Sequence, residues 1–156
     1  MDDMKLVRAK KVYEELCAVL DSKNWHYTKK EDKLIVELEL HGEDIPMRFL
    51  MMVDVSRQLI RVLSPMPFNF KQDKLVDGAI AACVASYGLP DGSFDYDIKT
   101  GCLFFKQTVS FIDSEIGQGL IEYIVYCSSC VVDQYNDKFM ALNNGIISVS
   151  DFISKY

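Results

Sequence analysis

One stretch constrains the fold more than any other: residues 86–111, SYGLPDGSFDYDIKTGCLFFKQTVSF, which separate two apolar helical patterns. Gly88 stands where a left-handed helix cap is expected, and Pro90 forbids continuation of the helix because proline lacks a backbone N–H. Alternating apolar residues then predict two strands, joined by a short turn that ends at Gly101. Strands joined by a tight hairpin are antiparallel. The stretch therefore predicts an antiparallel hairpin in a sheet against which the two flanking helices pack.

The remaining patterns predict an α+β fold built on an antiparallel sheet. The element order is helix, four strands, helix, two strands, long helix and short helix, and at 156 residues a single domain over 1–156 is expected. Helical spacing predicts helices over residues 2–21, 71–87 and 113–142, the third capped by Asp113 or Ser114. A last short helix is predicted to start at the capping box of Ser148 and Asp151. Alternation predicts strands over residues 25–28, 33–41, 46–54, 58–63, 93–98 and 102–111. Two prolines in residues 64–68 predict an extended connector there.

The second face of the predicted sheet is more apolar than a solvated face should be. If one set of alternating residues faces the core, the set on the opposite face contains Ile35, Leu50, Met52, Leu59, Leu63 and Phe104. A sheet covered on one side is expected to be mostly polar on the other. Either helices cover both faces, or these six residues form a surface that binds a partner protein. They are the candidate partner-binding residues.

Charge and hydropathy narrow the possible partners and location. A net charge of -6 argues against nucleic acid and against an anionic membrane, since both attract clustered Lys and Arg. No stretch reaches the roughly 20 apolar residues of a membrane span, and the first residues lack a signal-peptide pattern, so a cytoplasmic location is expected. The five cysteines lie among apolar residues and are expected to be buried and reduced.

Residues that could carry chemistry are few and lack the right context. Cys127 and Cys130 have the C-x-x-C spacing of redox or zinc sites, but they fall in mid-helix without further ligands. Asp91, Asp95 and Asp97 do not match a calcium loop. We therefore expect no catalytic, cofactor-binding or metal-binding residues, and no enzyme.

The central stretch resembles the bacterial YbjN-like family, whose members are described as candidate regulators of sensory transduction. The resemblance spans roughly residues 61–153 and is carried by Tyr87-Gly88, Gly92-x-Phe94, Asp97-x-x-x-Gly101 and Phe105-Lys106. Members of that family are similar in fold to type III secretion chaperones, which are small, acidic, dimeric proteins that hold segments of a client. The resemblance implies such a fold and a homodimer, and it offers no catalytic residues to transfer.

Together these patterns predict a non-enzymatic protein-binding module. It would act as a chaperone-like or regulatory adaptor that holds a segment of a partner protein, without a cofactor, nucleic acid or membrane. The alternative is a small-ligand sensor or small enzyme with a pocket between the sheet and the long helix. A third reading is a structural subunit with a large obligate interface.

Overall fold

A six-stranded sheet runs through the computed structural model, which describes residues 3–156. The strand order is β1-β2-β3-β4-β6-β5, and every neighbouring pair is antiparallel. The strands are β1 (Tyr27–Lys30), β2 (Ile35–Leu40), β3 (Met47–Asp54), β4 (Leu59–Asn69), β5 (Ser93–Asp97) and β6 (Cys102–Ser110). The predicted antiparallel α+β class is confirmed.

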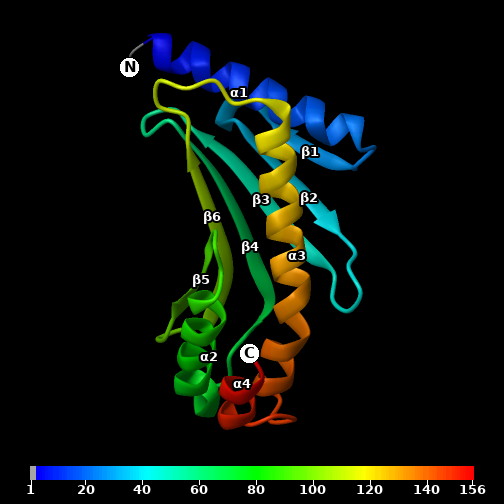
Figure 1. Cartoon of the computed structure of the whole chain (residues 1–156), viewed down its shortest axis with the longest axis vertical. Coiled ribbons are helices and arrows are strands. Elements are labelled where there is room, and N and C mark those ends of the chain that lie inside the picture. Colours follow the sequence, from blue (N-terminus) through cyan, green and yellow to red (C-terminus); the bar gives the residue numbers. More distant parts are fainter. Residues whose placement is uncertain (1–2) are drawn as a thin grey trace.

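Helices cover one face of this sheet (Figure 1). They are α1 (Asp3–Ser22), α2 (Leu75–Tyr87), α3 (Gln118–Asn143) and α4 (Val149–Lys155). The long α3 runs along the sheet, α1 crosses one end, and α2 and α4 lie at the other end. The predicted element order is confirmed, although the predicted start of the first helix at Asp2 lies outside the described residues. Within residues 3–156, no helix combines the length and hydropathy needed to cross a bilayer.

Aromatic rings fill the space between α3 and the sheet. Phe139 of α3 is fully buried, and its ring centroid lies 5.0 Å from that of Phe94 and 5.4 Å from that of Phe152. Phe105 of β6 is also fully buried and lies 5.5 Å from Phe94. Edge-to-face and stacked pairs at such distances stabilise a core beyond their buried area. The same rings tie α3, α4 and the sheet into one core.

The turn between β5 and β6 has the predicted geometry. Gly101 has a φ of 72°, a left-handed conformation that favours glycine. The Asp97 carboxylate accepts hydrogen bonds from the backbone N–H of Lys99, at 3.0 Å, and from the Thr100 hydroxyl, at 2.8 Å. The left-handed cap predicted at Gly88 is wrong, because its φ is -89°. The α2 helix instead ends with the Leu89 N–H bonded to the Ser86 carbonyl.

Two predicted boundaries are corrected by the structure. The segment predicted as a connector belongs to β4, which pairs with β6 through Pro65 and Phe104 and shifts register before Asn69. Pairing of β4 with β3 ends at Leu63, so the prolines lie where one side of the strand is free and a bulge interrupts the ladder. The long helix begins at Gln118 rather than at residue 113 or 114, after an extended N-cap at Gly117.

The α2 helix turns its small residues, not its large ones, toward the sheet. The spacing of its larger apolar residues predicts a core side made of Leu75, Ile80, Cys83 and Val84. Its buried residues are instead Gly78, Ala81, Ala82 and Ala85. The prediction is wrong for Ile80 and Cys83, which are exposed. Phe70 and Tyr96 occupy the space beneath the helix, and a Cβ added at Gly78 would lie 2.8 Å from the Phe70 ring. Only small residues fit on that side.

Candidate functional site

The side of the sheet that faces away from the helices carries the six residues predicted from alternation. We call this side the open face; its apolar residues are Ile35, Leu50, Met52, Leu59, Leu63 and Phe104, and each is half-buried. Their strand neighbours at alternating positions, such as Val36, Met51 and Val62, are buried on the helical side. Within residues 3–156 the helices therefore form one layer, and the first alternative, a sheet covered on both faces, is wrong.

The strand register arranges most of these residues in a diagonal stripe. Ile35 of β2 lies opposite Met52 of β3, and Leu50 of β3 lies opposite Leu63 of β4. Phe104 of β6 lies opposite Pro65, one step further along β4. Neighbouring side chains on one sheet face are within contact distance across and along strands. We call this run from Ile35 to Phe104 the apolar stripe; Leu59 lies apart from it, at the start of β4.

A three-residue ion-pair network borders the stripe at β1, β2 and β3. The Glu37 carboxylate accepts a hydrogen bond from the Lys30 ammonium and another from Arg48 Nη2 at 2.9 Å. The Lys30 hydrogen bond, followed by that from Arg48, lowers the pKa of Glu37 from its ordinary value. Both cations are therefore held in ion pairs with Glu37 beside the stripe.

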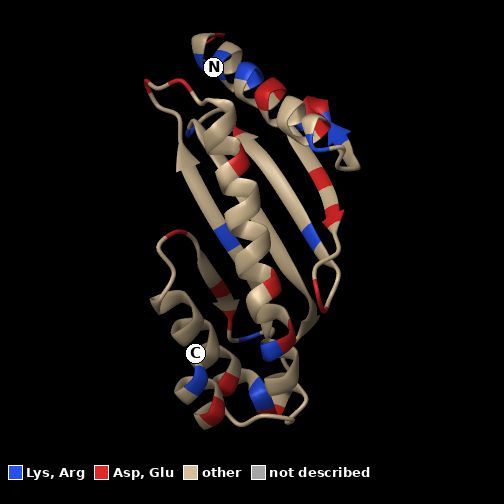
Figure 2. Cartoon of the chain, turned by 45° about the vertical axis from the view of Figure 1, so that its right-hand side comes forward, with Lys and Arg blue, Asp and Glu red and all other residues tan. Residues whose placement is uncertain are grey.

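Two further ion pairs border the stripe at β4 and β6. Arg61 Nη2 lies 3.4 Å from Asp54 Oδ2, and the Lys106 ammonium contacts the Asp95 carboxylate. The backbone N–H of Arg57, bonded to Asp54 at 3.0 Å, is the main cause of the lowered pKa of Asp54. Both signs of charge are interspersed along α1 and among the strands (Figure 2).

Acid is expected to disrupt the Glu37 network. A carboxylate whose pKa is lowered in the folded state adds stability that is complete above its unfolded pKa and is lost as the pH falls through the folded value. We expect the Glu37 carboxyl to titrate below its ordinary value of 4.5, measured by its carbon chemical shift. Arg48→Ala should raise that midpoint, whereas Arg57→Ala, at the distant β3–β4 turn, should leave it unchanged. A wild-type midpoint at or above 4.5 would contradict the network.

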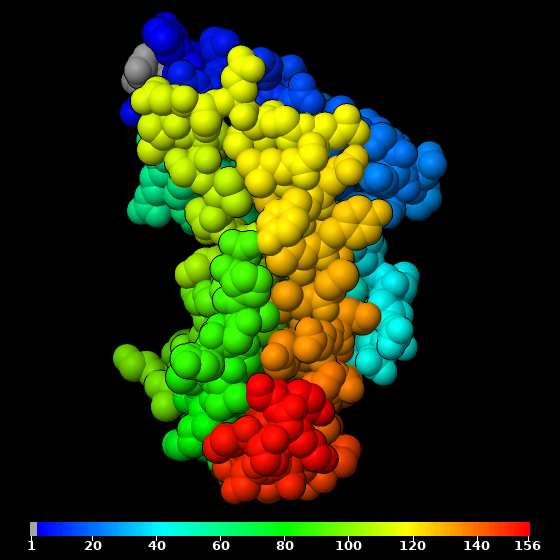
Figure 3. All heavy atoms as spheres, viewed as in Figure 1, coloured from blue at the N-terminus to red at the C-terminus, as the bar shows by residue number. Residues whose placement is uncertain are grey.

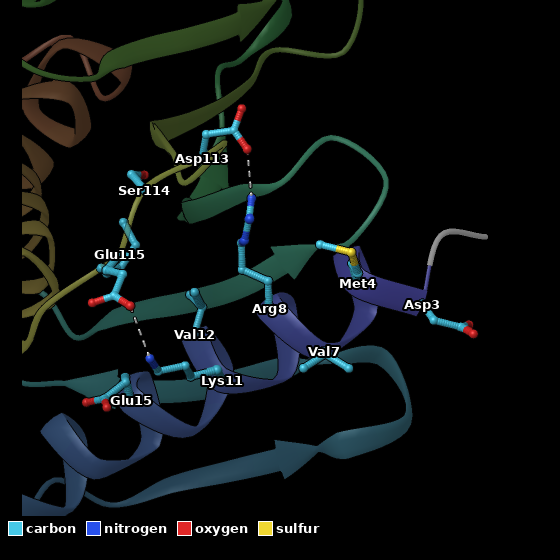
Figure 4. A pocket seen from close by; sticks show the side chains of 11 residues that line it. Asp3, Met4, Val7, Arg8, Lys11, Val12, Glu15, Asp113, Ser114 and Glu115 are labelled. Atoms are coloured by element: carbon cyan, nitrogen blue, oxygen red, sulfur yellow. Dashed lines mark hydrogen bonds and ion pairs between the residues drawn. The ribbon is translucent and has the colours of Figure 1, made fainter.

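A surface groove of about 630 Å³ lies between α1 and residues 113–116 (Figure 4). Arg8 Nη1 lies 3.4 Å from Asp113 Oδ1, and Lys11 Nζ lies 3.8 Å from Glu115 Oε1. These pairs connect the helix to the loop across the groove. Since each cation has its own carboxylate, the groove does not select an anionic ligand, and it is a weaker candidate than the open face.

A second cavity, of about 450 Å³, contains the buried thiol of Cys17. The Tyr13 hydroxyl donates to the Ile35 carbonyl at 3.3 Å, and burial raises the pKa of Tyr13 to about 12. Burial also raises the pKa of Cys17, so both groups are protonated at neutral pH. A thiol in that state is a poor nucleophile.

The other candidate residues do not come together into a site. Cys127 is half-buried and Cys130 is exposed, both in the middle of α3, so the expectation that all cysteines are buried is wrong. Asp95 lies on the open face and Asp97 accepts bonds from its own turn. Among residues 3–156, no group of three His, Cys, Asp or Glu side chains is arranged to hold a metal ion.

Sequence reasoning placed the apolar residues and the charged residues Glu37, Arg48 and Lys106 on the same face but could not pair the charges. Glu37, Arg61 and Lys106 occupy the same face as the stripe, and their alternation with apolar residues was visible in the sequence. Their partners could not be assigned, because pairing across strands depends on the register.

The fold is similar to that of a solved structure. The crystal structure of YbjN from E. coli, described there as a proposed transcription regulator, matches with a TM-score of 0.57 over 81% of this chain and 92% of that one. The chain has a YbjN-like fold. Sequence identity over the match is 10%, so the comparison establishes the fold alone. No family model and no curated protein matches the chain.

Proposed function

We propose that this chain is a non-enzymatic adaptor that holds an amphipathic helix of another protein on its open face. The observation that carries this proposal is the apolar stripe, which lies on a sheet face that no helix of residues 3–156 covers and which is bordered by paired charges. A contiguous apolar surface that remains partly exposed on an uncovered sheet face is typical of protein interaction sites.

The dimensions of the stripe suit one helix. From β2 to β6 the stripe crosses three strand spacings, about 14 Å, and it advances about four residues along the strands, also about 14 Å. Its diagonal is therefore about 20 Å, the length of a helix of roughly 13 residues. A helix with apolar residues at i, i+3 or i+4, and i+7 would place them along this diagonal.

The charges of the open face favour a partner that binds through apolar contacts. Lys30 and Arg48 share the Glu37 carboxylate, Arg61 is paired with Asp54, and Lys106 is paired with Asp95. Nucleic acid requires cations that are free to contact phosphate, so it is disfavoured as an occupant. The paired charges form a polar rim around an apolar centre, the usual anatomy of a protein–protein interface.

An added strand is a weaker alternative than a helix. The edge strand β1 has only four residues and ends in Lys29 and Lys30. Short, lysine-rich edges are a common device against strand pairing. The description of the YbjN structure as that of a regulator is compatible with an adaptor that acts by holding another protein. A chaperone-like adaptor for a bacterial client is thus the finer form of this proposal.

Site-specific photocrosslinking tests the proposed function. Leu63 lies in the middle of the stripe, and we expect benzoylphenylalanine at this position to crosslink a partner in the native cell. Mass spectrometry of the adduct should place the crosslinks in an amphipathic helical segment. The matched control carries the same probe at Lys10, which is exposed on α1 away from the open face, and should give no such adduct.

The double substitution Leu50→Glu and Met52→Glu should abolish the Leu63 adduct. Both residues are half-buried on the open face, so their replacement should leave the circular dichroism spectrum of the chain unchanged. Unfolding of the double variant would place these residues in the core. Equal adducts from positions 63 and 10, or adducts that survive the double substitution, would contradict the proposed site.

A further inference from the structure

Arg61 is the only charged residue of β4, and it lies in the interior of the open face. It stands opposite Met52 of β3 on one side and opposite Thr108 of β6 on the other, and it is two residues from Leu63 of the apolar stripe. Figure 3 shows the opposite side of the molecule, where α2, α3 and α4 cover the sheet. The Arg61 side chain is 25% exposed, so its neighbours on the open face already cover most of it.

The guanidinium of Arg61 is only partly satisfied within the chain. A guanidinium has five N–H donors in a planar fork. Its Nη2 lies 3.4 Å from Asp54 Oδ2, which is longer than a usual N–H···O bond, and no other hydrogen bond or ion pair within residues 3–156 involves this group. Arg48 also uses a single nitrogen, but it bonds Glu37 at 2.9 Å and its side chain is 61% exposed, so water reaches its other donors. Arg61 thus combines free donors with a mostly covered side chain.

We infer that the partner helix on the open face carries an aspartate or glutamate that binds Arg61 through both carboxylate oxygens. This inference rests on the proposed function, because it names a residue of the partner that occupies the same face. A carboxylate matches the fork of a guanidinium with two parallel hydrogen bonds. Arginines that become covered at an interface are among the residues that contribute most to binding.

The charges around Arg61 favour an acidic residue at this point of the partner. Lys106 of β6 lies on the same long side of the apolar stripe as Arg61, and Glu37 of β2 lies on the other long side. The two carboxylates nearest to these cations, Asp54 and Asp95, lie toward the ends of the stripe. A partner carboxylate above β4 and β6 would therefore meet two cations, whereas one on the far side would meet Glu37. The edge of the partner helix that faces β6 is expected to be acidic.

Binding would move Arg61 from Asp54 to the partner at little cost. The Asp54 carboxylate would keep its bonds from Ser56 Oγ, at 2.8 Å, and from the Arg57 N–H, at 3.0 Å. A helix without an acidic residue would cover the guanidinium and leave its donors unpaired, which is unfavourable. Arg61 would thus select among apolar helices.

The Leu63 adduct measures this inference. Arg61→Gln keeps a polar side chain but removes the charge and the fork, and we expect it to weaken binding about tenfold or more, seen as a loss of adduct at equal expression. Arg61→Lys should restore only part of the yield, because an ammonium cannot form two parallel bonds to a carboxylate. The matched control is Arg57→Gln, at an exposed residue of the β3–β4 turn, which should keep the wild-type yield.

Asp54→Asn separates binding by Arg61 from a structural role of its ion pair. The asparagine Oδ1 can accept both turn bonds, but the side chain no longer attracts Arg61, so the adduct yield should rise. If the pair only held the sheet together, Asp54→Asn should lower the yield as Arg61→Gln does.

The crosslinked segment supplies the last measurement, because it should contain an aspartate or glutamate within one helical turn of the crosslinked residue. Absence of an adduct from the wild-type sequence with the probe at Leu63 would overturn both the proposed function and this inference. An adduct that is insensitive to Arg61→Gln, that falls with Asp54→Asn, or that maps to a helix without an acidic residue would overturn this inference alone.

Discussion

Replacing Phe139 with alanine is expected to lower the free energy of unfolding by about 3–5 kcal/mol. The Phe139 ring is fully buried and contacts rings from three other parts of the fold: Phe70 after β4, Phe94 of β5 and Phe152 of α4. Its removal leaves a cavity that these elements cannot all close at once. Domains are stable by only about 5–15 kcal/mol, so the variant should approach the limit of folding.

Urea unfolding measures this loss, followed by the fluorescence of the single tryptophan, Trp25, whose ring lies 5.7 Å from that of Tyr126. Phe104→Ala is the matched control, because Phe104 is half-buried on the open face and makes no ring contact with the Phe139 cluster. Its cost should be about 1 kcal/mol. Equal losses for the two variants would mean that the core is not centred on Phe139.

The sheet was predictable because alternation has a period that only a strand provides. In β3, Met47, Phe49, Met51 and Val53 are buried in strict alternation with Arg48, Leu50 and Met52, as the pattern required. A shift of one residue would have exchanged the two sets, so the pattern determines which side chains share a face. The same argument placed all six candidate residues on one side of the sheet.

The orientation of α2 could not be predicted in the same way. Its sequence is apolar at nearly every position, so no polar side marked the solvent. Phe70 and Tyr96 determine which side of α2 faces the sheet, because they fill the space below the helix and leave room only for small residues. Such a steric effect comes from residues that are distant in sequence. It left Ile80 and Cys83 exposed, although the sequence pattern had assigned both to the core.

The ion pairs of the open face could not be predicted from the sequence either. Alternation placed Glu37 and Arg48 on the same face, but their ion pair depends on which residues of β2 and β3 stand opposite one another. Whether a helix covers that face depends on where the chain returns after β6, and the late start of α3 at Gln118 was not predicted. The sequence could therefore identify the apolar stripe but not its exposure.

Replacing Gly101 with alanine is expected to cost about 2–4 kcal/mol, because two penalties act together. The φ of 72° is unfavourable for a residue with a Cβ. That Cβ would also lie 2.4 Å from the Phe70 carbonyl oxygen and 2.9 Å from the Phe70 nitrogen. These are backbone atoms, and the Phe70 N–H donates to the Gly101 carbonyl at 2.9 Å, so neither strand can move away without breaking that bond.

Gly119→Ala is the matched control for this substitution. Gly119 lies in the first turn of α3, its φ is not positive, and an added Cβ would meet nothing within 4 Å. Alanine is a better helix former than glycine, so this variant should gain up to about 1 kcal/mol. Thermal and urea unfolding of both variants should thus move in opposite directions. A Gly101→Ala variant as stable as the wild type would contradict this prediction. It would mean that the turn can adopt another conformation, and that the contact between Phe70 and the β5–β6 hairpin is not needed to hold the end of β4 in place.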